Sequence, residues 1–158
     1  DAECIKRAEI AEIPHKIIRG NDFSQKELFE LEIVNTLIYY DVELVVMAGW
    51  MKIMSSKFVN AFKNKIINIH PSLLPSFKGN NAIKQAIAYD SKITGCSAHF
   101  VEPEVDNGPL IMQAALSISD QDNNDLITKK IHLLEHKILP LSISEAGYLG
   151  RKKFKGNY

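Results

Sequence analysis

A short apolar run opens the stretch Ile66-Ile67-Asn68-Ile69-His70-Pro71-Ser72-Leu73-Leu74-Pro75. Its isoleucines predict a buried β-strand, which ends at His70 because Pro71 has no N–H to donate to a neighbouring strand. Side chains alternate between the faces of a strand, so Asn68 and His70 point the same way. In open α/β sheets, ligands bind beyond the carboxyl ends of the strands. We therefore expect an amide and an imidazole side by side near a ligand, although a capping Asn and a passive His in a turn would also fit.

Apolar periodicity and turn residues predict alternating helices and strands on both sides of this strand. Before it, we expect a helix over residues 1–9, a strand over 13–18, a helix over 24–40 and a strand over 43–48. After it, we expect helices over 57–62 and 80–89, strands over 94–101 and 110–118, and a long helix over 126–147 that is kinked or offset near Pro140. This order predicts an α/β sandwich whose first strands are parallel and whose last strands are mixed.

The predicted helices begin at capping residues. Ser24 and Glu27 have the spacing of a capping box, and Ser55 can cap the helix over 57–62. Apolar residues follow Ser24 at helical spacing and predict an amphipathic helix: Leu28, Leu31, Val34 and Ile38.

The composition excludes several classes of partner. Among 158 residues, Lys and Arg number 19 and Asp and Glu number 19, so the formal net charge is zero and no basic field favours nucleic acid or an anionic membrane. Cys4 and Cys96 lack the spacing of a metal or redox motif. The sequence contains no signal-peptide pattern and no apolar run as long as a membrane span, so we expect a reduced, cytoplasmic protein. The oligomeric state is left open, with a homodimer as one option.

The stretch from Asn68 to Pro75, followed by Gly79 and by Asp106-Asn107-Gly108-Pro109, closely resembles the folate-dependent formyltransferases, and among them most of all the purine-synthesis branch. The resemblance extends over nearly the whole chain. It implies a Rossmann-like three-layer sandwich with a mostly parallel central sheet and an antiparallel late part. It also implies one formyltransferase domain over 1–158, with a basic, loose tail over 151–158 and without the family's first βα unit and its Gly-Ser-Asn phosphate loop.

The resemblance implies that a formyl group passes from 10-formyltetrahydrofolate to the amine of phosphoribosylglycinamide, with no metal. Its catalytic residues carry over onto Asn68, His70 and Asp106. An amide can donate to a developing oxyanion, an imidazole can donate or shuttle a proton, and a nearby carboxylate favours the charged imidazole. Ser97 and His99 share one face of a strand that packs beside the catalytic His in the family, so both are candidate supports, although His99 fits a core histidine equally well.

The resemblance also implies two binding regions. The folate region consists of Met51, Lys52, Ile53, Met54, Phe58, Val59, Ile66, Val101, Glu102, Pro103, Glu104, Val105 and Asp106. The amine substrate would meet Gly49, Trp50, Met51, Pro71, Gly79 and Glu135, with Lys26 as a candidate for its phosphate. The aliphatic residues among these also fit a core, and Lys26 fits a solvated surface. Asn80-Asn81-Ala82-Ile83 departs from the family, which usually carries His or another polar residue there.

Three other hypotheses about function fit parts of the same sequence. A formyltetrahydrofolate hydrolase shares the Asn, His and Asp but admits water in place of the amine. A folate-binding relic without activity is a further alternative, which the intact Asn68, His70 and Asp106 disfavour. His132-Leu133-Leu134-Glu135-His136 has the form of an inverted zinc-protease motif, which still lacks another ligand downstream.

Overall fold

The computed structural model describes residues 3–119 and 122–155, with side chains as far as Gly147. The chain divides into two compact units, Asp1–Asp41 and Val42–Tyr158. Of the helices in the described part, none is both long and apolar enough to cross a membrane.

The N-terminal unit contains α1 (Glu3–Ile10), the 3-10 helix η1 (Gly20–Asp22) and α2 (Lys26–Tyr39). The strand expected over 13–18 is wrong, because these residues are irregular. Side-chain hydrogen bonds connect this segment to α2: Lys16 Nζ donates to Glu32 Oε1 at 2.6 Å and to Thr36 Oγ1 at 3.1 Å.

The expected start and stripe of α2 also need correction. The N-cap is Gln25, so Ser24 lies one residue too early for the expected capping box. The side chain of Gln25 makes no capping hydrogen bond. The expected apolar stripe includes the exposed Leu28 and Ile38, whereas Phe29 is buried. Helical spacing alone therefore did not identify the buried face.

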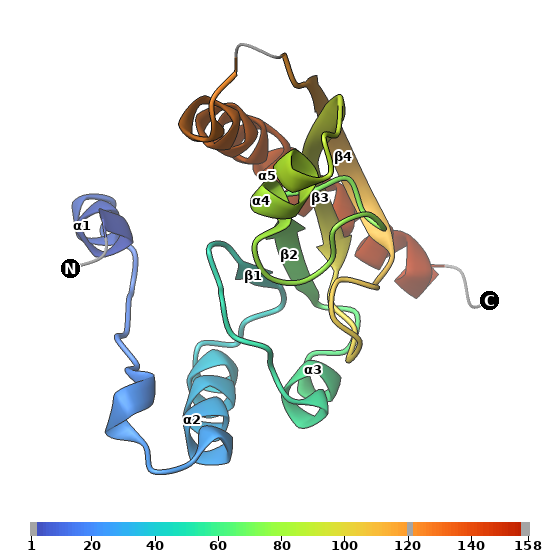
Figure 1. Ribbon diagram of the computed structural model, residues 1–158. Helices are drawn as coiled ribbons and strands as arrows, with labels where there is room; N and C mark the ends of the chain where they lie inside the picture. Colours follow the sequence, from blue (N-terminus) through green and yellow to red (C-terminus); the bar gives the residue numbers. More distant parts are fainter. Residues whose placement is uncertain (1–2, 120–121, 156–158) are drawn as a thin grey trace. The chain divides into compact units, whose positions relative to one another are not determined.

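In the second unit, the described strands form one four-stranded open sheet in the order β1-β2-β3-β4 (Figure 1). They are β1 (Val45–Met47), β2 (Ile66–His70), β3 (Ile93–Phe100) and β4 (Leu110–Ser117). β1 and β2 are parallel, whereas β2–β3 and β3–β4 are antiparallel. The expected mixed α/β fold is confirmed, with its parallel part in these strands limited to the β1–β2 pair.

The helices of this unit are α3 (Ser56–Ala61), α4 (Ala82–Ala88) and α5 (Asn124–Lys155). The expected cap at Ser55 is confirmed, since its side chain accepts from Phe58 N at 3.2 Å. α5 continues through Pro140 to Lys155, so the loose tail expected from residue 151 is wrong as far as 155, and 156–158 lie outside the described residues. Lys and Arg are good helix formers, so the basic composition of this segment also suits a helix.

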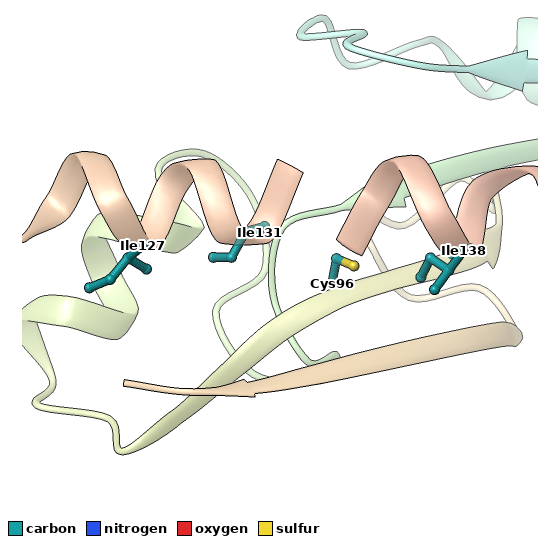
Figure 2. Close-up of a cluster of buried hydrophobic side chains, with 5 residues drawn as sticks. Cys96, Ile127, Ile131 and Ile138 are labelled. Carbon is teal, nitrogen blue, oxygen red and sulfur yellow. The ribbon is translucent and has the colours of Figure 1, made fainter. Parts of the chain in front are cut away.

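The core lies between α5 and one face of β3. Cys96 and Ala98 of β3 cluster with Ile127, Ile131 and Ile138 of α5, and four of these residues are labelled in Figure 2. Because side chains alternate along a strand, the residues between and beside Cys96 and Ala98 point to the opposite face. One face of the central strands thus builds the core, and the other is free to carry polar chemistry.

Candidate active site

The register of β2 and β3 places four polar residues on the face opposite α5. Asn68 lies opposite His99, and His70 lies opposite Ser97. Directly opposed residues of antiparallel strands project to the same side. His70, Ser97 and His99 are all at most 5% exposed. The predicted pairing of Asn68 with His70 on one face is therefore extended by two residues from the next strand.

The loop between β3 and β4 carries Asp106 to these residues. Asp106 Oδ2 lies 3.2 Å from His70 Nδ1, and Asp106 Oδ1 lies 3.6 Å from His99 Nε2. The three residues predicted to be catalytic thus belong to one cluster, in which Asn68 connects to Asp106 through His99.

His99 has a fixed orientation in this cluster. Its Nδ1–H donates to the carbonyl oxygen of Phe100 at 2.8 Å, which leaves Nε2 directed at the cluster. Asn68 Nδ2 lies 3.5 Å from this Nε2. The pairing of β3 with β4 is irregular between Ala98 and His99, and such bulges commonly redirect a side chain. A neutral His99 accepts from Asn68, whereas a protonated His99 donates to Asp106.

His70 faces an oxygen on each side of its ring. Nε2–H donates to the carbonyl oxygen of Phe77 at 2.9 Å, and Nδ1 faces Asp106. A carbonyl and a carboxylate only accept, so the doubly protonated ring satisfies both contacts. This arrangement suits a positively charged ring that stabilises a negative charge developing beside it.

The environment of Asp106 favours its carboxylate. Burial alone would raise the pKa of Asp106, but the hydrogen bonds from His99 and from Gly79 N–H, together with the charges of His70 and His99, lower it below the usual value. Gly79 N donates to Asp106 Oδ2 at 2.8 Å. Asp106 has a left-handed backbone with φ of 49°, which Asp tolerates better than most residues.

Ser97 supports the loop that follows His70. Its hydroxyl donates to Ser72 O at 2.7 Å and accepts from Leu74 N at 3.0 Å and from Gln113 Nε2 at 2.8 Å. Ser97 therefore fixes the backbone that leaves the carboxyl end of β2. Sequence reasoning gave Ser97 a supporting place but did not identify Ser72 or Gln113, because their partners depend on strand register.

A cavity of about 640 Å³ adjoins the cluster and is lined by Asn68, His70, His99 and Asp106. Most residues expected to bind folate also line it: Met51, Lys52, Ile53, Met54, Val59, Val101, Glu102, Pro103, Glu104 and Val105. Phe58 and Ile66 are 3% and 1% exposed and are absent from this wall among the described residues, so the structure places them in the interior.

The residues expected to meet the amine substrate line the same cavity: Gly49, Trp50, Met51, Pro71, Gly79 and Glu135. Burial raises the pKa of Glu135, and the charge of His136 lowers it by less. A half-buried carboxyl group at a cavity wall suits a ligand that offers hydroxyl groups.

Comparison with known proteins identifies the family. The model of the formyl transferase family matches residues 1–143. The chain belongs to the formyl transferase family. The matched region includes every residue of the cluster around Asp106.

Relatives of this chain include both short and long proteins. Phosphoribosylglycinamide formyltransferase of Bacillus subtilis is 39% identical over 91% of this chain and 74% of that protein. The trifunctional purine biosynthetic protein adenosine-3 of Chironomus tentans is 39% identical over 92% of this chain, but this chain spans only 11% of its length. The crystal structure of phosphoribosylglycinamide formyltransferase from Bacillus halodurans is 36% identical, with a TM-score of 0.87 over 94% of this chain and 75% of that one.

Other residues line the cavity without having been expected there: Met47, Ile69, Asn80, Asn81, Ala82, Ile83, Lys84, Ile87, Asn124, Asp125, Thr128 and His132. Most of them lie on α4 and at the start of α5. Their contribution depends on how those helices pack beside the sheet, which residue spacing does not reveal. Gln85 supports this region, since its Nε2 donates to Asn80 O at 2.8 Å.

Two further predictions concern residues away from the cluster. Lys26 lies in the N-terminal unit, where its Nζ is 3.6 Å from Glu30 Oε1. In the zinc-protease reading, His132 and Glu135 line the cavity, and His136 is exposed. Among the described residues, no group of three or more His, Cys, Asp or Glu is arranged to hold a metal ion.

Proposed function

We propose that this formyl transferase moves a formyl group from 10-formyltetrahydrofolate to the amine of phosphoribosylglycinamide in purine synthesis. The observation that carries the proposal is the cluster of Asn68, His70 and Asp106 at the wall of a cavity of about 640 Å³. The names of the relatives from Bacillus subtilis and Escherichia coli support the same reaction.

In the proposed reaction, the amine nitrogen bonds to the formyl carbon, whose oxygen becomes negatively charged. Asn68 donates to this oxygen, and the positive charge of the His70 ring lies beside it; preorganised groups of this kind stabilise a tetrahedral intermediate strongly. The bond from the carbon to folate N10 then breaks. The proton lost by the amine passes by way of Asp106 to N10, so atoms and charge balance.

The cavity offers separate regions for the two substrates. The flat pterin suits the apolar wall of Met51, Ile53 and Met54 and the backbone of residues 102–106. The glycinamide ribonucleotide would lie towards Gly49, Gly79 and Glu135, whose carboxyl group can accept from ribose hydroxyls. Binding of its phosphate by Lys26 stays a prediction from the sequence.

The folate acts here as a co-substrate, and the mechanism assigns no step to a metal. The match of the family model over 1–143 supports one formyltransferase domain that includes both units. Cytoplasmic location and homodimer formation stay predictions from the sequence.

A transfer assay tests the proposal against the hydrolase. Loss of the formyl group from 10-formyltetrahydrofolate is followed by absorbance, and formylated ribonucleotide by chromatography, with and without phosphoribosylglycinamide. We expect loss of the formyl group to require the amine and to equal product formation. Equal loss without the amine would identify a hydrolase and refute the proposal. The His70→Ala variant is the control for uncatalysed reaction.

A further inference from the structure

The segment after β2 folds back over the catalytic histidine. Ser72 N donates to His70 O at 2.9 Å, and Ser72 Oγ donates to Ser76 O at 2.6 Å. Gln113 Nε2 donates to Leu74 O at 3.0 Å, which ties the segment to β4. Together with Ser97, these bonds fix the path of the backbone that leads to Phe77.

Phe77 has an unusual backbone conformation at the end of this path. Its φ is 54°, in the left-handed region that bulky residues rarely adopt. Such conformations persist where the surroundings impose them, and they concentrate at functional sites. The ring of Phe77 packs edge-on against the ring of Tyr89 at the end of α4, with centroids 5.9 Å apart. Packing on one side and hydrogen bonds on the other therefore hold Phe77 in place.

The same short segment contacts both members of the His70–Asp106 pair. The carbonyl oxygen of Phe77 accepts from His70 Nε2, and two residues later Gly79 N–H donates to Asp106 Oδ2. Gly79 is also left-handed, with φ of 78°. Both contacts come from backbone groups. They therefore depend on the backbone conformation of this segment rather than on its side chains.

We propose that Phe77 is a positioning residue, whose left-handed backbone aims a carbonyl oxygen at His70 Nε2 and so leaves Nδ1 as the nitrogen beside Asp106 at the cavity. This inference rests on the proposed formyl transfer for its kinetic consequence. Without the carbonyl, the ring can rotate, and Nδ1 is no longer held beside Asp106. Phe77 thereby selects the productive orientation of His70 without contacting a substrate.

Two substitutions separate the backbone of Phe77 from its ring. Phe77→Asn removes the ring, but Asn tolerates the left-handed region. Phe77→Val keeps an apolar side chain, but a β-branched residue strongly disfavours this region. We expect kcat of Phe77→Asn to stay within about threefold of the unaltered protein. We expect kcat of Phe77→Val to fall by about 10- to 100-fold, the range for losing a hydrogen bond to a charged group, with KM for both substrates little changed.

Nitrogen-15 NMR of the histidine rings provides a reading that does not depend on activity. The His70 Nε2 signal should report a protonated, hydrogen-bonded nitrogen in the unaltered protein and in Phe77→Asn, and it should shift in Phe77→Val. Should Phe77→Val not fold, Phe77→Ala takes its place. If Asn and Val lower kcat equally, or if the His70 signal is the same in all variants, the positioning role is refuted. If the unaltered protein transfers no formyl group, the proposed function fails, but the NMR comparison still decides the role of Phe77.

Discussion

Gly108, in the loop that carries Asp106, has no room for a side chain. A Cβ at Gly108 would lie 1.8 Å from the carbonyl oxygen of Phe100 and 2.8 Å from its carbonyl carbon. Real Cβ atoms essentially never come within 3.0 Å of such atoms, so the backbone would have to move by about 1.2 Å. That movement would break the bond from Phe100 N to Pro109 O, now 2.9 Å long, which closes the loop carrying Asp106.

We therefore expect Gly108→Ala to lower the free energy of unfolding by about 2–4 kcal/mol, because overpacking and one lost hydrogen bond add together. A shift of about 1 Å in Asp106 should lower kcat by about 100-fold. Urea unfolding followed by circular dichroism measures the first effect, and the transfer assay measures the second.

Gly147→Ala is the matched control. Nothing lies within 4 Å of a Cβ at Gly147, which is inside α5. We expect this variant to be neutral or to stabilise the protein by up to about 1 kcal/mol, since Ala favours helices over Gly. The reasoning would be refuted if Gly108→Ala changed stability by less than about 0.5 kcal/mol, the range for ordinary surface substitutions.

Three more outcomes follow from the site and the core. A thiol reagent should label the exposed Cys4 rapidly and Cys96 only on unfolding. Burial, and then the charge of Glu135, raise the pKa of Cys96 to about 12, so its thiol is not ionised. Rapid labelling of both thiols in the native protein would contradict this. Glu135→Gln should stabilise the protein at neutral pH. The pKa of Glu135 is raised in the folded state, so the folded state binds the proton more tightly than the unfolded state does. The carboxyl group therefore costs stability as the pH rises above 4.5, its usual pKa, and glutamine removes that cost. That gain should vanish in urea unfolding at about pH 3.5, where the carboxyl group is protonated in both states, and an equal gain at both pH values would contradict it. Asn68→Ala should lower kcat by about 10²- to 10³-fold by removing an oxyanion donor, and a change confined to KM would contradict that role.

Strand alternation was enough to predict the polar face of β2. Ile67 and Ile69 read as apolar and Asn68 and His70 as polar, and a period of two residues assigns them to opposite faces. The strand expected over 13–18 failed because apolar content does not supply a partner strand. The length of α5 was underestimated because the apolar stripe was followed only as far as Gly147, whereas the helix continues to Lys155.

The contacts around Asn68, His70 and Asp106 could not be predicted in the same way. The place of His99 between Asn68 and Asp106 depends on the register of β3 with β2 and on the irregularity at Ala98. The carbonyl of Phe77 depends on a left-handed backbone, for which a phenylalanine gives no signal. Local patterns thus predicted which side chains share a face, whereas tertiary packing decides which atoms they contact.

The most direct test of the proposed catalytic unit is a double-mutant cycle between His70 and Asp106, measured on kcat for formyl transfer. Asp106→Asn keeps the left-handed backbone and an acceptor for Gly79 N–H but removes the charge 3.2 Å from His70 Nδ1. Alone it should lower kcat by about 10- to 100-fold, as expected for loss of a charged contact. In a His70→Ala background, we expect the same substitution to lower kcat by less than about threefold, because residues that act as one unit are not additive. Equal losses in both backgrounds would show that His70 and Asp106 act separately and would contradict the coupled amide–imidazole–carboxylate mechanism.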